Sequence, residues 1–110
     1  MLPRKKNTNT VFGRRLRQIR KYRELPQYRL GVLAGLEESS SSARISRYET
    51  GIYEPTFQFA EALAEILAVS PAYLFCPDDQ LAELILVFST LPAGKRNALL
   101  KAAKELTDDN

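Results

Sequence analysis

Histidine and tryptophan are absent from this 110-residue sequence, and cysteine and methionine each occur once. Without histidine the chain has neither a Cys/His zinc finger nor a histidine base, and a lone cysteine excludes an internal disulfide. That cysteine, Cys76, has the apolar neighbours Leu74 and Phe75, which favour burial over redox chemistry. Glycine-rich phosphate loops and carboxylates clustered beside a nucleophile are also lacking. We therefore expect no enzymatic activity, no metal and no cofactor.

Long apolar runs are missing as well. No stretch is long enough to cross a bilayer, and the first ten residues are basic and polar, unlike the apolar core of a signal peptide. We therefore expect a cytoplasmic protein without a membrane partner. Hydrophobic residues still make up 45% of the chain, including five Phe and five Tyr, which suffices for one packed core.

Charge is divided unevenly along the chain. The formal net charge is +3, but residues 1–56 hold 12 Lys and Arg against 5 acidic residues, whereas residues 57–110 hold 4 against 8. A solvated helix face explains any one of these arginines but not the partition. The division indicates one half that binds a polyanion and another half with a different task.

Apolar residues recur at helical spacing along the chain, as in the stripe of Phe12, Leu16 and Ile19. No segment shows the alternation typical of a strand, so we predict an all-α protein. The predicted helices comprise residues 11–23, 26–34, a helix ending at Glu49, residues 57–69, 72–75, a helix over Leu81 to Phe88, and residues 93–106.

Cap residues mark several of the helix boundaries. Thr10, Thr56 and Ser70 each precede an apolar periodic segment, as an N-cap residue does. Gly35 is expected in the left-handed conformation that ends the second helix. The serine run Ser39–Ser42 offers several N-caps for the third helix.

The segment from Phe12 to Pro55 combines a basic amphipathic helix, the sequence PQYRLGVLAGL, a serine-rich turn and the sequence ARISRYETG. This order resembles the phage-repressor or XRE-type helix-turn-helix family, in which the second helix of the motif enters the major groove of DNA. The resemblance implies a lambda-repressor-like bundle of about five helices, here followed by a C-terminal helical hairpin. The positions that carry the resemblance are Phe12, Leu16, Arg20, Gln27, Leu30, Gly35, Ile45, Ser46, Arg47, Glu49, Gly51 and Pro55.

The family resemblance also implies which residues contact DNA. Base contacts, counted from the buried Ile45, fall on Ser42, Ala43, Arg44 and Arg47. Phosphate contacts fall on Arg20, Gln27, Ser41, Thr50 and Tyr53. Arg44 is the leading candidate because arginine binds guanine bidentately. Arg47 remains open between a base contact, a phosphate contact and an ion pair with Glu49.

One interval departs from the family pattern. Gly35 and Ile45 are ten positions apart, about four more than is usual, so we expect a lengthened turn within Glu37–Ser42. Two acidic residues in this segment do not suit a phosphate surface. Either the turn points away from the DNA or the third helix begins earlier.

We divide the chain into a basic arm (1–10), a helix-turn-helix domain (11–76) and a C-terminal helical pair (77–110). The arm either wraps DNA or is a solvated tail, and its cations are Arg4, Lys5 and Lys6. The C-terminal pair carries two apolar stripes that suit a homodimer interface. The stripes consist of Leu81, Leu84, Ile85 and Phe88, and of Leu99, Leu100, Ala103 and Leu106.

The leading hypothesis is a bacterial or phage transcriptional repressor that binds a pseudo-palindromic operator in double-stranded DNA as a homodimer. The alternative is an antitoxin-type interaction protein that binds a second protein and represses its own operon. RNA remains a weaker third partner, because basic surface alone does not choose the polymer. No small-molecule effector is expected, because a separate sensing domain has no room after residue 75.

Overall fold

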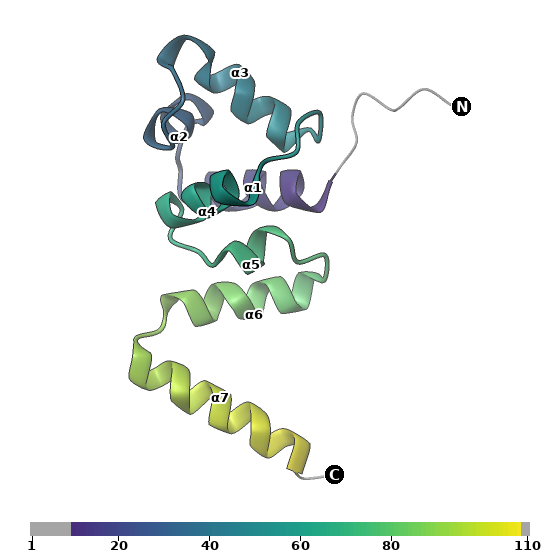
Figure 1. The fold of residues 1–110 in the computed structure, drawn as a ribbon. Coiled ribbons are helices and arrows are strands. Elements are labelled where there is room, and N and C mark those ends of the chain that lie inside the picture. The colour runs from purple at the N-terminus through teal and green to yellow at the C-terminus, as the bar shows by residue number, and fades with distance from the viewer. Residues whose placement is uncertain (1–9, 109–110) are drawn as a thin grey trace, which may run out of the picture.

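The computed structural model describes residues 10–108, and this range consists of helices without a strand (Figure 1). The prediction of an all-α fold is therefore confirmed. The seven helices are α1 (Val11–Tyr22), α2 (Gln27–Leu33), α3 (Glu38–Glu49), α4 (Phe57–Ile66), α5 (Pro71–Leu74), α6 (Asp79–Thr90) and α7 (Ala93–Asp108). None of these helices is long and apolar enough to span a membrane.

The predicted caps at Thr10, Thr56 and Ser70 are confirmed. Each side-chain oxygen accepts a hydrogen bond from a backbone N–H of the first turn, in α1, α4 and α5 respectively. Such a bond satisfies one of the N–H groups that have no partner inside the helix. Helix α4 ends three residues earlier than predicted, because Ala68 adopts a φ of 54° and takes the chain out of the helical conformation.

The core lies between helices α1 to α5. Leu16, Ile45 and Leu63, from three different helices, have no exposed surface. Full burial of one such side chain contributes about 1.5–3 kcal/mol. Cys76 is buried at the edge of this core, as its apolar neighbours indicated.

The turn between α2 and α3 is short. Gly35 has a φ of 97°, and the N–H of Leu36 donates to Gly31 O at 2.9 Å, which ends α2. Helix α3 then begins at Glu38, so Ser39–Ser42 form its first turns. The prediction of an N-cap among these serines is wrong, since Glu37 holds that position. The additional residues lengthen the helix and not the turn.

Space for the early start of α3 comes from Gly31. A Cβ atom placed on Gly31 would lie 1.9 Å from Ser41 Oγ and 3.1 Å from Ser41 Cβ. The Ser41 hydroxyl is completely buried and donates to Tyr28 O at 2.7 Å. The glycine therefore allows α2 and α3 to approach closely at the position of a buried serine.

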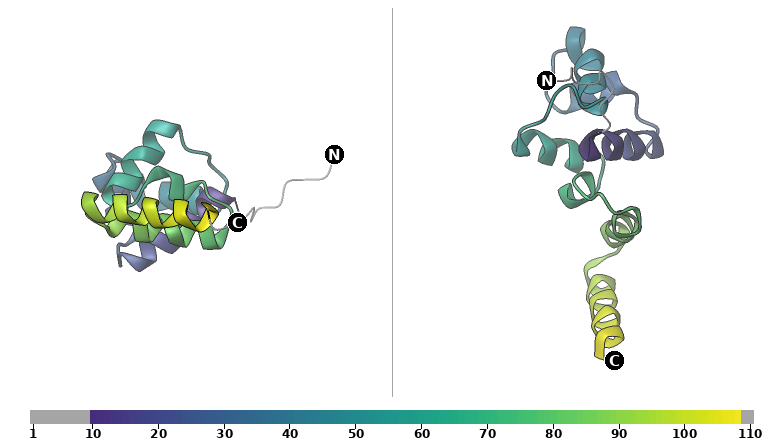
Figure 2. Two further views of the ribbon diagram at one scale, coloured as in Figure 1. Left: turned by 90° about the horizontal axis from the view of Figure 1, so that it is seen from below. Right: turned by 90° about the vertical axis from the view of Figure 1, so that its right-hand side faces the viewer.

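The C-terminal helices extend away from this core. Helix α6 packs against α5 and buries only Ala82, and α7 buries none of its residues. The two helices diverge from their shared corner as an open V (Figure 1). They lie at the end of the molecule opposite α3 (Figures 1 and 2). The V is held at its corner by Arg96, whose Nε and Nη2 donate to the carbonyls of Phe88 and Ser89 at 3.0 and 3.1 Å.

The replacement Gly31→Ala should destabilise the fold by about 1–3 kcal/mol, because the added methyl group meets Ser41. Urea unfolding measures the change. Gly94→Ala is the matched control, since a Cβ atom at Gly94 meets nothing within 4 Å. Adding Ser41→Gly to Gly31→Ala should make the double variant less unstable than the sum of its two single variants. Additive effects would contradict a steric contact between the two sites.

Candidate nucleic-acid interface

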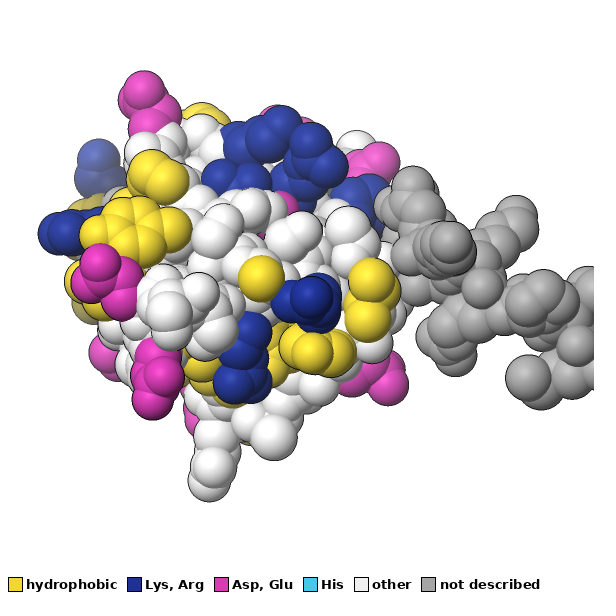
Figure 3. Space-filling model, turned by 90° about the horizontal axis from the view of Figure 1, so that it is seen from above, with side chains coloured by type: hydrophobic (Ala, Val, Ile, Leu, Met, Phe, Trp, Pro, Cys, Tyr) yellow, Lys and Arg dark blue, Asp and Glu magenta, His cyan; other side chains and the backbone are white. Residues whose placement is uncertain are grey.

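Helix α3 lies at one end of the molecule, and its outer side faces solvent. Three of its inner residues, Ser41, Ile45 and Tyr48, are buried at helical spacing, so the opposite stripe is turned outward. Seen from this end, Lys and Arg side chains lie near the middle of the face and along its upper and left edges, and most acidic side chains lie toward its outline (Figure 3). The predicted base contacts Ser42, Ala43, Arg44 and Arg47 are all exposed on α3.

Aromatic packing anchors the end of α3. The ring centroid of Tyr48 lies 5.3 Å from that of Phe59 in α4 and 5.7 Å from that of Tyr53 in the following loop. Tyr48 is therefore buried in the protein and does not belong to the exposed face. The guanidinium of Arg47 in turn lies 5.8 Å from the centre of the Tyr53 ring. This contact places an arginine and a phenol side by side at one edge of the exposed face.

A buried carboxylate joins the three N-terminal helices. Glu49, at the end of α3, has a side chain that is 3% exposed, and Arg20 Nε donates to its Oε2 at 2.5 Å. Gln27 Nε2 donates to the other oxygen, Oε1, at 3.0 Å. The ion pair considered for Arg47 and Glu49 is therefore wrong, because Arg20 occupies this carboxylate.

The guanidinium of Arg20 bonds to groups inside the protein and is not turned toward the exposed face of α3. Its Nη1 donates to Leu25 O at 3.0 Å, its Nη2 donates to Glu49 Oε1 at 3.2 Å, and its side chain is only 12% exposed. We therefore remove Arg20 from the phosphate contacts. Ser41 is removed as well, because its hydroxyl is buried and bonded to a backbone carbonyl.

The remaining phosphate candidates lie around the outer face of α3. Gln27 is half-buried at the start of α2, and Ser42 Oγ donates to its Oε1 at 3.5 Å. Thr50 is half-buried and donates to Ser46 O at 3.0 Å, and Tyr53 is 42% exposed. These side chains border the exposed stripe of α3. Residues 1–9, which include Arg4, Lys5 and Lys6, lie outside the described residues.

Ile52 belongs to the same surface, although the sequence did not single it out. Its side chain is 57% exposed in the loop after α3. Together with Ala43, Ser46, Arg47 and Thr50 it lines a shallow hollow along the helix. The signal in the sequence was its place beside Gly51, which has a φ of 82° and turns the chain back toward α3.

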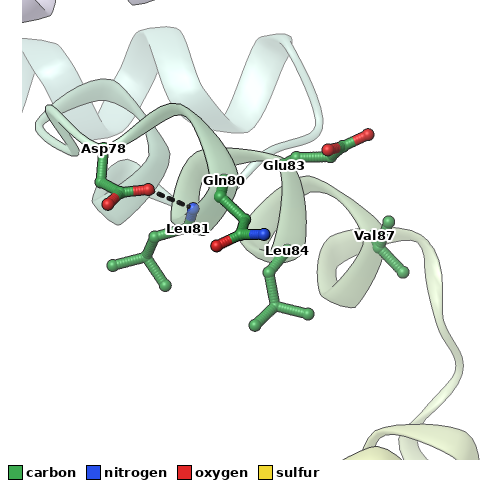
Figure 4. A pocket seen from close by; sticks show the side chains of 6 residues that line it. All are labelled: Asp78, Gln80, Leu81, Glu83, Leu84 and Val87. Atoms are coloured by element: carbon green, nitrogen blue, oxygen red, sulfur yellow. Dashed lines mark hydrogen bonds between the residues drawn. The ribbon is translucent and has the colours of Figure 1, made fainter.

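A second surface, distant from α3, collects the residues expected at a dimer interface. An apolar cleft of about 350 Å³ opens between α6 and α7, and all of those residues line it except Leu106, which is 73% exposed. The outer side of α6 shows Leu81 and Leu84 pointing to the same side, next to the cap residue Asp78 (Figure 4). Most side chains of the C-terminal stripes therefore remain exposed within one chain, whereas Ile85 and Leu99 are half-buried.

The described residues contain no group of three His, Cys, Asp or Glu that could hold a metal ion. The raised pKa of Tyr73, caused by burial and opposed by the charge of Arg15, concerns a residue in α5, outside the exposed face of α3. The chemistry of the interface is thus that of guanidinium, hydroxyl, amide and methyl groups. These are the groups that bind phosphates and base edges.

Comparison with known proteins agrees with this geometry. Residues 11–74 match the family model of the helix-turn-helix domain. The crystal structure of the transcriptional regulator BswR is similar with a TM-score of 0.81 and 40% sequence identity, over 84% of this chain and 92% of that chain. No curated protein sequence matches the chain. The resemblance noted in the sequence is therefore confirmed, and the chain belongs to the helix-turn-helix family of DNA-binding transcriptional regulators.

Proposed function

We propose that this protein is a sequence-specific transcriptional repressor that binds a pseudo-palindromic operator as a homodimer. The observation that carries the proposal is the outer face of α3, where the exposed arginines Arg44 and Arg47 accompany small side chains. A helix of this kind fits the major groove, where base pairs present distinct patterns of donors and acceptors. The resemblance to phage repressors supports repression.

Base readout is assigned to Ser42, Ala43, Arg44 and Arg47. Within residues 10–108, no hydrogen bond or ion pair occupies the Arg44 guanidinium, so its donors are available to guanine. The short side chains of Ser42 and Ala43 allow α3 to approach the floor of the groove. Arg47 stacks on Tyr53 and stands at the edge of the face, which suits a contact to a base or a neighbouring phosphate.

Phosphate contacts are assigned to Gln27, Thr50 and Tyr53. Glu49 accepts a hydrogen bond from the amide of Gln27 and holds this amide in one orientation. The side chain is therefore preorganised before DNA binds. Contacts of this type fix the register of the protein on the duplex and carry no direct sequence information. The arm cations Arg4, Lys5 and Lys6 add to the positive charge that meets the DNA.

The homodimer is assigned to the surface of α6 and α7. A single helix of this length is marginally stable in water, yet α7 has 16 residues and buries none of them within its own chain. A second copy presents the same apolar surface, and a two-fold interface pairs identical surfaces of this kind. Helices α6 and α7, which line the cleft, lie at the end of the molecule opposite α3 (Figure 1). A dimer formed there leaves both basic faces free for DNA. The interface consists of Leu81, Leu84, Ile85, Phe88, Leu99, Leu100, Ala103 and Leu106.

DNA binding should depend steeply on salt. With about six phosphates neutralised by Lys and Arg side chains of the dimer, affinity should fall about 1000-fold between about 50 and 200 mM salt, because bound counterions are released. Fluorescence anisotropy with a labelled operator selected from a random pool measures this. Duplex RNA of the same sequence serves as the competitor that tests the polymer. Affinity that hardly changes with salt would contradict the assignment of the basic face.

Two substitutions should separate base contacts from phosphate contacts. Arg44→Ala should weaken binding to the best operator by about 1–3 kcal/mol and relax the preference at one base pair. Gln27→Ala should weaken binding to the operator and to random duplex by similar factors. Anisotropy titrations on both duplexes give the comparison. Equal losses for Arg44→Ala on operator and random duplex would reduce Arg44 to a phosphate contact.

The dimer assignment is tested by two variants of α7, each with a glutamate at one of two neighbouring positions. Leu100→Glu puts a carboxylate in the apolar cleft and should raise the dimer dissociation constant at least about tenfold, which corresponds to about 1.4 kcal/mol. Lys101→Glu makes a larger change of charge outside the lining of the cleft and should have a smaller effect. Sedimentation velocity measures both. An unchanged dimer in Leu100→Glu would place the interface elsewhere.

A further inference from the structure

A buried arginine joins the DNA-binding helices to α6. The Arg15 side chain is 3% exposed, and its Nε donates to Cys76 O at 2.8 Å. Its Nη2 donates to Pro77 O at 3.3 Å and to Asp79 Oδ1 at 2.8 Å. One guanidinium in α1 therefore binds the connection before α6 and the first residue of α6.

Arg15 stands on a helix that is itself tightly held to α3. A Cβ atom on Gly13 would lie 2.4 Å from Glu49 O and 2.7 Å from Tyr48 O, so the backbones of α1 and α3 are in direct contact. Two turns farther along α1, Arg20 pairs with the Glu49 carboxylate. The position of α3 is thus transmitted to Arg15 through a stiff helix.

The rest of α6 is held to the core by few contacts. Ala82 is its one buried residue, Ile85 and Leu86 are partly buried, and Ser89 Oγ accepts from Ser70 N at 3.4 Å. Asp79 is 86% exposed, although it forms the ion pair with Arg15. Because exposed and buried ion pairs contribute little net stability, the main consequence of this cluster is geometric. It fixes the direction in which α6 leaves the DNA-binding helices.

We propose that Arg15 is a positioning residue that sets the spacing between the two half-sites of the operator. This inference rests on the proposed dimer through α6 and α7. Arg15 and Asp79 fix α6 relative to α3 in each protomer, and the dimer interface fixes one α6 relative to the other. The distance and rotation between the two recognition helices therefore depend on this cluster.

DNA geometry makes spacing a sensitive measure of this link. One additional base pair between half-sites moves the second one by about 3.4 Å and rotates it by about 34°. A stiff connection from α3 to α6 rejects such a displaced half-site. A connection released from Arg15 turns to follow it.

The test compares operators with 0, 1 or 2 additional base pairs between the half-sites. Full-length wild type, Asp79→Asn and Arg15→Lys are titrated on each operator and on a duplex with a single half-site. Wild type should prefer the best spacing over one additional base pair by at least about tenfold. In Arg15→Lys, which cannot form all the bonds of the guanidinium, this preference should fall to about threefold or less. In Asp79→Asn, which keeps the bonds of Arg15 to Cys76 and Pro77, it should fall by a smaller factor. Half-site affinity should be unchanged in both variants. Glu61→Gln makes the same chemical change as Asp79→Asn at an exposed position of α4. This control variant should retain the wild-type spacing preference.

Each outcome of this test either supports or overturns the proposal. Asp79 is exposed and leaves the Arg15 bonds to Cys76 and Pro77 in place, so Asp79→Asn should remain folded, as a thermal melt verifies. Parallel losses on all operators and on the half-site would show a merely structural role and overturn the proposal. Variants that keep the wild-type spacing preference would overturn it as well. If the wild-type protein forms no dimer, either free or on any operator, and shows no spacing preference, the proposed dimer is overturned. The Arg15 proposal is then overturned with it.

Discussion

The DNA-binding half depends on the hydrogen bonds and the ion pair that the Glu49 carboxylate forms. It is the buried acidic side chain of residues 10–108, and it lies where α1, α2 and α3 meet. Removing a carboxylate from water costs several kcal/mol unless donors replace the solvent, and Arg20 and Gln27 supply them. The three helices are therefore tied at one point, next to the backbone contact of α1 and α3 at Gly13. The outer face of α3 is presented on a unit that has little freedom to rearrange.

Local chemistry accounts for most of what the sequence predicted. The caps at Thr10, Thr56 and Ser70 and the left-handed Gly35 each depend on neighbours within four residues, so they can be recognised without a fold. The burial of Ile45 and the exposure of Arg44 follow from the family motif. These positions were enough to predict the fold and to locate the face of α3.

The errors concern contacts between distant parts of the chain. A serine serves equally as N-cap or in a first helical turn, and the space that Gly31 leaves for Ser41 decides between them ten residues away. The pair of Arg20 and Glu49 joins positions 29 residues apart, and several arginines were available to that carboxylate. Spacing in a sequence does not rank such partners, because the choice depends on how the helices cross.

The early start of α3 has a consequence for how this protein can change over evolutionary time. About four additional residues lengthen the helix by about 6 Å at its N-terminal end. Of these serines, Ser39 and Ser42 point to solvent, while Ser41 fills the space beside Gly31. Mutation at the two exposed serines alters what α3 presents to DNA without disturbing the core. A larger residue at Gly31, in contrast, would meet Ser41, so the exposed positions and the packed position lie within a single helical turn.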